Sequence, residues 1–182
     1  MKFDFKNCSE EALWKYVASH LNKKGIDTVL VGGAVVSIYT KGAYKSGDLD
    51  FITTNLFVDD LPEAMAEIGF KKTSKRHYEH PECPHLFVEF PPGPIGIGEE
   101  LNIEPDVMNV KGAAIKILSP TDSVKDRLAS YIHFQDRDGL DQALLIAKSQ
   151  PIKLDAVLKW CEREGAIDAF EEFKQGLEPY SK

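Results

Sequence analysis

The segment 31–52, VGGAVVSIYTKGAYKSGDLDFI, constrains the fold more than any other part of the chain. A short β-branched run at 28–31 leads into a glycine pair, Gly32 and Gly33, and a brief apolar stretch of helical length follows. A second strand-like run then occupies 49–53. Because β-branched runs favour strands and paired glycines permit tight turns, the segment predicts strand, turn, short buried helix and strand.

Two acids mark the start of the second predicted strand. Side chains two positions apart on a strand point to the same face, about 6.5 Å from each other, so Asp48 and Asp50 direct both carboxylates to one side while Leu49 enters the core. Such a pair repels unless a cation lies between its members, and Mg²⁺ is commonly held by one or two carboxylates together with substrate phosphates. The turn at Gly32 and Gly33 lets backbone N–H groups approach a polyphosphate. The pattern therefore predicts a divalent metal and a phosphate-bearing ligand.

In this order, the glycine pair and the motif DLD resemble the signature of the polymerase-β-like nucleotidyltransferase superfamily. That signature also has a third carboxylate on a neighbouring strand, between apolar residues, and LFVEF supplies one at Glu89. Asp106 is the alternative if Glu89 points away from the site. The resemblance implies that Asp48, Asp50 and Glu89 are catalytic and bind Mg²⁺ or Mn²⁺, that an NTP is the substrate, and that pyrophosphate leaves.

A longer segment, 119–147, resembles the helical region of uncharacterised bacterial nucleotidyltransferase-like proteins, including relatives of toxins from toxin-antitoxin and phage-defence loci. In that comparison Lys125 and Arg127 face the triphosphate. Lys125, Asp126 and Arg127 are adjacent on one helix and cannot all face one cleft, and Lys125 is the preferred of the three. The comparison also places three further residues along the cleft: His133, Asp136 and Arg137. The complete set expected to bind the nucleotide is Gly32, Gly33, Ser46, Lys125 and Arg127.

The rest of the chain predicts an α+β fold, a nucleotidyltransferase-like mixed β-sheet flanked by helices with a C-terminal helical bundle. The catalytic core is expected at 1–118 and the helical region packed on it at 119–182. Beyond the opening segment, strands are expected at 85–90 and 114–118. Helices are expected from Ser9 to Gly25 and at 61–68, 120–135, 139–148, 153–164 and 166–175. The glycine- and proline-rich segment 91–98 is expected to form an ordered loop near a site.

Composition narrows the class of protein. The net charge of −7 argues against sequence-independent clamping of nucleic acid. A basic run at 71–77 is either a solvated turn or a contact for RNA or the NTP. The three cysteines stand at unrelated spacings and no apolar run reaches membrane-spanning length, so we expect a cytoplasmic protein with no membrane partner.

The run KRHYEHPECPH gathers residues of the types that zinc prefers: His77, His80, Cys83 and His85. Their spacing is irregular, and the two prolines among them restrict how the chain can wrap an ion. Two interpretations stay open, a zinc site and a polar loop beside the active cleft.

Two hypotheses for function follow. The first is a metal-dependent nucleotidyltransferase that moves an NMP group from an NTP to an acceptor, which the sequence leaves open among RNA, protein and a small molecule. The second is a catalytically silent module of the same fold that binds a nucleotide or a partner protein, such as an antitoxin.

Overall fold

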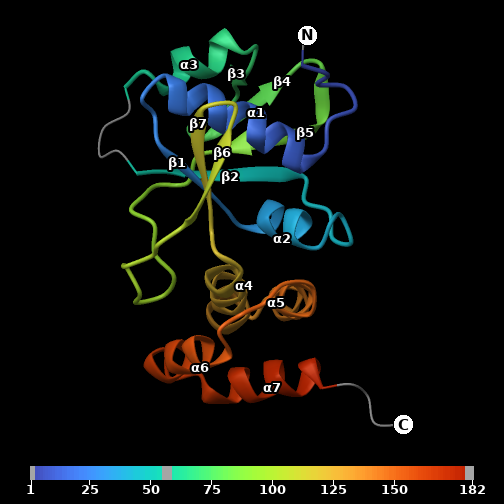
Figure 1. The fold of residues 1–182 in the computed structure, drawn as a ribbon, viewed down its shortest axis with the longest axis vertical. Helices are drawn as coiled ribbons and strands as arrows, with labels where there is room; N and C mark the ends of the chain where they lie inside the picture. The colour runs from blue at the N-terminus through green and yellow to red at the C-terminus, as the bar shows by residue number, and fades with distance from the viewer. Residues whose placement is uncertain (1–2, 55–58, 179–182) are drawn as a thin grey trace.

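A computed structural model describes residues 3–54 and 59–178, and shows a mixed seven-stranded sheet in the upper half of the view, with helices above and below it (Figure 1). The predicted α+β class is confirmed. Residues 1–2 and 55–58 of the predicted core and residues 179–182 of the predicted helical region lie outside the described residues.

The described helices are α1 (Glu10–Lys23), α2 (Gly33–Tyr39), α3 (Leu61–Glu67), α4 (Pro120–Phe134), α5 (Arg137–Ser149), α6 (Leu154–Arg163) and α7 (Ile167–Leu177). The described strands are β1 (Thr28–Val31), β2 (Asp48–Thr53), β3 (Lys71–Lys72), β4 (His77–His80), β5 (Cys83–Glu89), β6 (Asp106–Val110) and β7 (Ala113–Ile117). The strand order is β3-β4-β5-β2-β1-β7-β6, with β1–β7 and β2–β5 parallel and the other neighbours antiparallel. None of the described helices combines the length and apolar character that crossing a membrane requires.

Alternation along the strands separates two apolar clusters. Leu30, Leu49 and Phe51 belong to the cluster shared with α1, and all three are fully buried. Val29 and Val31 point the other way and belong to a second cluster, which is shared with the C-terminal helices. Since β-strand side chains alternate between faces, the residues next to Leu49 must lie on the face turned toward those helices. This face carries the two aspartates.

Capping residues fix two helix starts where the sequence predicts them. The Ser9 hydroxyl accepts a hydrogen bond from Ala12 N at the start of α1, and the Ser119 hydroxyl accepts one from Asp122 N at the start of α4. Both bonds satisfy backbone donors that the first helical turn leaves unpaired. The predicted helices of the last third appear within about two residues of their expected bounds.

Three strands were not predicted from the sequence: β3, β4 and β6. Every residue of β6 except Val110 is exposed, so the strand lacks the alternation that identifies a half-buried strand. The loop 91–98 is ordered by α6, because Trp160 Nε1 donates to the Ile97 carbonyl at 3.0 Å. The loop therefore packs against the C-terminal helices.

Candidate active site

The sheet register brings three carboxylates together. Asp50 on β2 lies beside Glu89 on β5, and Asp48 lies beside Phe87. Positions side by side on neighbouring strands share a face, so the three acids lie on the face opposite Leu49. Asp106, the alternative third acid, lies on the edge strand β6, with β1 and β7 between it and β2.

Charge and burial act together on Asp50. Burial, together with the negative charges of Asp48 and Glu89, raises the pKa of its carboxyl to about 7 from an ordinary 3.8. The guanidinium of Arg127 acts in the opposite direction. Like charges held this close favour a proton or a cation at the centre of the group.

Both glycines of the pair make room for this group. A Cβ on Gly32 would lie 2.5 Å from Asp50 Oδ2, and the residue has a φ of 75°, which favours glycine. A Cβ on Gly33 would lie 2.7 Å from the Ser46 hydroxyl. That hydroxyl donates to Asp48 Oδ1 at 2.5 Å and so fixes the carboxylate. Gly32, Gly33 and Ser46 thus surround the aspartate pair.

Arg127 is the α4 cation that reaches the site. Its Nε and Nη2 atoms donate to Asp126 Oδ2 at 3.1 and 2.7 Å, and Nη1 donates to Gln142 Oε1 at 3.2 Å. These bonds hold the guanidinium on the side of α4 that faces Asp50. Close packing of α5 on α4 supports the position, since a Cβ on Gly139 would lie 2.6 Å from the Arg127 carbonyl oxygen.

Lys125, which the sequence favoured over Arg127, lies elsewhere. Its side chain is 6% exposed, and its ammonium group donates to Glu100 Oε2 and Asp122 Oδ1, both at 3.0 Å. Residues two apart on a helix are about 200° apart around its axis, so Lys125 and Arg127 point to opposite sides. Lys125 joins α4 to the loop that carries Glu100.

The three other helical residues expected along the cleft take part in contacts between or within helices. His133 Nε2 lies 3.1 Å from Glu164 Oε2, and Arg137 pairs with Glu172 at 3.0 Å. Asp136 caps α5, since its side chain accepts a hydrogen bond from Asp138 N. These contacts explain why the segment combines charged residues with helical periodicity.

Two residues near the carboxylates, His77 and Tyr44, were not predicted from the sequence to belong to the active site. His77 Nδ1 donates to Glu89 Oε1 at 2.9 Å, and its ring stacks on Phe87 at 4.1 Å between centroids. Tyr44 lies in the loop before the aspartates, where its hydroxyl accepts a hydrogen bond from Gln142. Burial raises the Tyr44 pKa, and the charges of Arg127 and Asp48 also act on it. His77 was grouped with the other histidines because sequence proximity gives no register.

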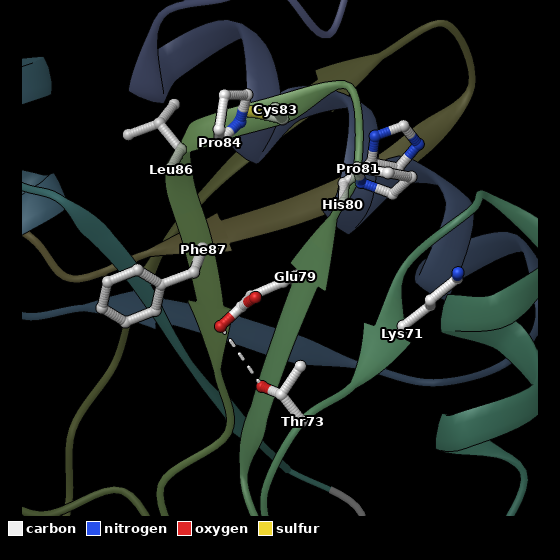
Figure 2. A pocket seen from close by; sticks show the side chains of 9 residues that line it. All are labelled: Lys71, Thr73, Glu79, His80, Pro81, Cys83, Pro84, Leu86 and Phe87. Carbon is white, nitrogen blue, oxygen red and sulfur yellow. Dashed lines mark hydrogen bonds between the residues drawn. The ribbon is translucent and has the colours of Figure 1, made fainter.

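A hollow of about 420 Å³ lies over β3, β4 and β5 at the outer end of the sheet (Figure 2). Lys71, Glu79 and Phe87 line it from adjacent positions on β3, β4 and β5. Thr73 donates to Glu79 across its floor at 3.4 Å. The hollow adjoins the candidate site because Phe87 stacks on His77, the partner of Glu89. The run 71–77 thus contributes two side chains to this surface, Lys71 and Thr73, of which Lys71 is basic.

The donor set fits a hard divalent cation. Three carboxylates on one face supply the oxygen ligands that Mg²⁺ and Mn²⁺ prefer. Burial and the charges of Asp48 and Glu89 raise the pKa of Asp50, and a bound cation would offset both effects. The absence of a side chain at Gly32 leaves Asp50 Oδ2 free of steric overlap.

Comparison with known proteins agrees with this geometry. Residues 10–76 match the family described as "Nucleotidyl transferase of unknown function (DUF2204)". This segment contains the glycine pair and both aspartates, and ends before Glu89. No curated protein matches the chain.

Two solved structures share the fold at low sequence identity. The solution structure of the antibiotic-resistance factor ANT(2″)-Ia superposes with a TM-score of 0.59 at 10% identity, covering 91% of this chain and 96% of that one. An antigenic nucleotidyltransferase-like protein from Paracoccidioides brasiliensis superposes with a TM-score of 0.53 at 13% identity, covering 90% and 92%. The family match covers the segment with the glycine pair and the aspartates, and the two structures show that the chain has a nucleotidyltransferase-like fold.

Proposed function

We propose that the protein transfers an NMP group from an NTP to an acceptor, with Asp48, Asp50 and Glu89 holding Mg²⁺ or Mn²⁺. The observation that carries the proposal is the register of β2 and β5, which sets Glu89 beside Asp50 on the face that also bears Asp48. The match of the glycine and aspartate segment to a nucleotidyl transferase family supports the reaction class.

The reaction exchanges one P–O bond for another. The acceptor oxygen bonds to the α-phosphorus, the bond from that phosphorus to the bridging oxygen breaks, and pyrophosphate leaves. The proton of the acceptor passes to Glu89, which the His77 N–H orients. A divalent ion, when bound by the three carboxylates, neutralises charge on the phosphates.

Arg127 is the protein cation for the phosphates. Its guanidinium is held by Asp126 and Gln142 through one N–H of each nitrogen, and each Nη nitrogen carries a second N–H. A planar donor fixed in this way binds phosphate oxygens without a further loss of side-chain entropy. The second N–H groups are therefore assigned to the nucleotide.

The acceptor is left open among RNA, protein and a small molecule. The hollow lined by Lys71, Glu79 and Phe87 is the place for an acceptor group, because it adjoins Glu89 through His77. Three predictions from the sequence alone stay predictions: a relation to toxins, an antitoxin partner and a cytoplasmic location.

The decisive experiment follows label from each NTP, labelled at the α-phosphate, into a fractionated cell lysate with Mg²⁺ or Mn²⁺. Asp48→Asn and Asp50→Asn are the test variants, and Glu63→Gln, an exposed acid on α3, is the control. We expect label in a discrete species with the parent protein and the control, and a loss of at least about 100-fold in both aspartate variants.

Pyrophosphate release, measured in the same reactions, must match label transfer one to one. Nucleotide binding by equilibrium dialysis separates the two hypotheses. Binding without transfer from any NTP would establish the silent module instead of the enzyme. Transfer that persists in the aspartate variants would overturn the proposed site.

A further inference from the structure

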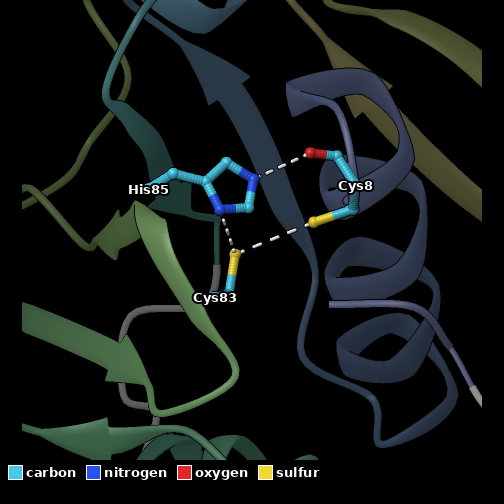
Figure 3. A group of neighbouring side chains, drawn as sticks. All are labelled: Cys8, Cys83 and His85. Atoms are coloured by element: carbon cyan, nitrogen blue, oxygen red, sulfur yellow. Dashed lines mark hydrogen bonds between the residues drawn. The ribbon is translucent and has the colours of Figure 1, made fainter. Parts of the chain in front are cut away.

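Cys8, Cys83 and His85 form a cluster between the segment before α1 and β5 (Figure 3). Cys8 lies just before α1, whereas Cys83 and His85 lie on β5, 75 and 77 residues further along the chain. Cys8 Sγ is 3.7 Å from Cys83 Sγ, and Cys83 Sγ is 3.9 Å from His85 Nδ1. All three potential ligand atoms lie within 4.8 Å of one another.

These separations match the edges of a tetrahedral zinc site. Two Zn–S bonds of about 2.3 Å at the tetrahedral angle place the sulfurs about 3.8 Å apart, and a Zn–N bond of about 2.0 Å gives a sulfur-to-nitrogen edge of about 3.5 Å. The observed 3.7 and 3.9 Å lie close to both values. The third edge, from Cys8 Sγ to the His85 ring nitrogen, is at most 4.8 Å, so an ion can contact all three atoms once the imidazole and the Cys8 side chain move closer together.

The imidazole of His85 is oriented as a metal ligand. Its Nε2 lies 2.9 Å from the Cys8 carbonyl oxygen, to which it donates, so the proton is on Nε2 and the Nδ1 lone pair faces Cys83. A backbone carbonyl that accepts from the second ring nitrogen is the usual outer-shell partner of a zinc-bound histidine. Here the carbonyl belongs to another of the three proposed ligand residues.

The neighbouring histidines are engaged elsewhere. His77 donates to Glu89 at the candidate active site. His80 stacks on Phe5 with 3.6 Å between centroids, and its Nδ1 accepts a hydrogen bond from Glu82 N. The histidines grouped in the sequence are thus divided by the fold, and Cys8 completes the set instead.

We propose that Cys8, Cys83 and His85 bind one Zn²⁺ ion and so fasten the segment before α1 to β5. The fourth ligand is water, because Cys8 is only half-buried and His85 is exposed. Thiolate and imidazole donors select zinc, whereas the three carboxylates of the candidate active site select Mg²⁺ or Mn²⁺. The zinc site does not depend on the proposed transferase activity.

The test uses the full-length protein with its cysteines reduced. Zinc affinity is measured against a chromogenic chelator, and Co²⁺ is added separately to look for a thiolate-to-cobalt charge-transfer band. We expect one Zn²⁺ per chain and a cobalt band. Cys8→Ser and His85→Gln should each weaken zinc binding by at least about 100-fold, more than a change of an outer-shell partner costs.

Cys161→Ala and His133→Gln are the controls, because both residues lie in the C-terminal helical part and leave the cluster intact. Both should keep the stoichiometry and affinity of the parent. His85 is exposed, so His85→Gln stays informative if Cys8→Ser fails to fold. Zinc binding that is absent from the reduced parent, or unchanged in His85→Gln, overturns the proposal. The proposal is also overturned if mass spectrometry finds a disulfide between Cys8 and Cys83 and the reduced protein takes up no zinc.

Discussion

Glu89 on β5 lies directly beside Asp50 on β2 in the parallel register of the sheet, and its carboxylate accepts a hydrogen bond from His77. The two acids therefore have different environments. Asp50 is largely buried and has a raised pKa, whereas Glu89 is bound to an imidazole. The buried, negatively surrounded carboxyl of Asp50 favours a bound cation and so suits metal binding. The hydrogen bond from His77 fixes the orientation of the Glu89 carboxylate, which suits it to accept a proton.

The stability of the metal-free protein should depend on Asp50 and on pH. Because the folded-state pKa is about 7 and the ordinary value is 3.8, the folded protein retains a proton that the unfolded chain loses, and stability falls as pH rises through this window. Asp50→Asn removes the effect, so the variant should exceed the parent by up to about 4 kcal/mol at pH 8 in chelator, at about 1.4 kcal/mol per pKa unit. Urea unfolding from pH 4 to 8 measures the difference. A difference that stays constant across this range would contradict the assignment.

Gly32→Ala should damage the site more than a glycine change elsewhere. Gly32 and Gly42 both have positive φ, but a Cβ on Gly42 meets nothing within 4 Å, whereas one on Gly32 meets Asp50 Oδ2. We expect Gly42→Ala to cost about 1 kcal/mol of unfolding free energy and Gly32→Ala about 2–4 kcal/mol. Only Gly32→Ala should also weaken Mn²⁺ binding, measured by paramagnetic relaxation. Equal effects in the two variants would remove the steric argument.

His77 should act on the reaction through Glu89. His77→Phe keeps an aromatic ring against Phe87 and removes the N–H that Glu89 accepts. We expect kcat for label transfer to fall about 10- to 100-fold with KM for the NTP unchanged. His77→Asn, whose amide can donate in place of Nδ1, should recover part of the loss. A change in KM alone would assign His77 to nucleotide binding.

Substitution of Arg127 should weaken NTP binding, whereas substitution of Lys125 should lower the stability of the fold. Arg127→Lys loses the two-point contact with Asp126, and NTP affinity should fall about 10-fold. Lys125→Met leaves Glu100 and Asp122 without their ammonium partner, so the unfolding free energy should fall by about 1–3 kcal/mol while NTP affinity is unchanged. Isothermal titration calorimetry and urea unfolding measure the two effects. If Lys125→Met weakens NTP binding and Arg127→Lys does not, Lys125 is the residue that binds the nucleotide.

The sequence alone determined the local elements with strong patterns. Ser9 and Ser119 cap helices, and Gly32 interrupts a β-branched run, so α1, α4 and the turn after β1 follow from short-range chemistry. The alternation of Asp48, Leu49 and Asp50 likewise gave the two faces of β2. These features depend on residues within a few positions of one another.

Only the tertiary structure decided which distant residues meet. The β2–β5 register sets Glu89 beside Asp50, and helix rotation brings Arg127, not Lys125, to face it. The same long-range pairing assigns His77 to Glu89 and His85 to Cys8. Strand register and helix rotation are fixed by the burial of whole faces against other elements. The residues next to a given position in the sequence therefore do not determine which distant residue it will contact.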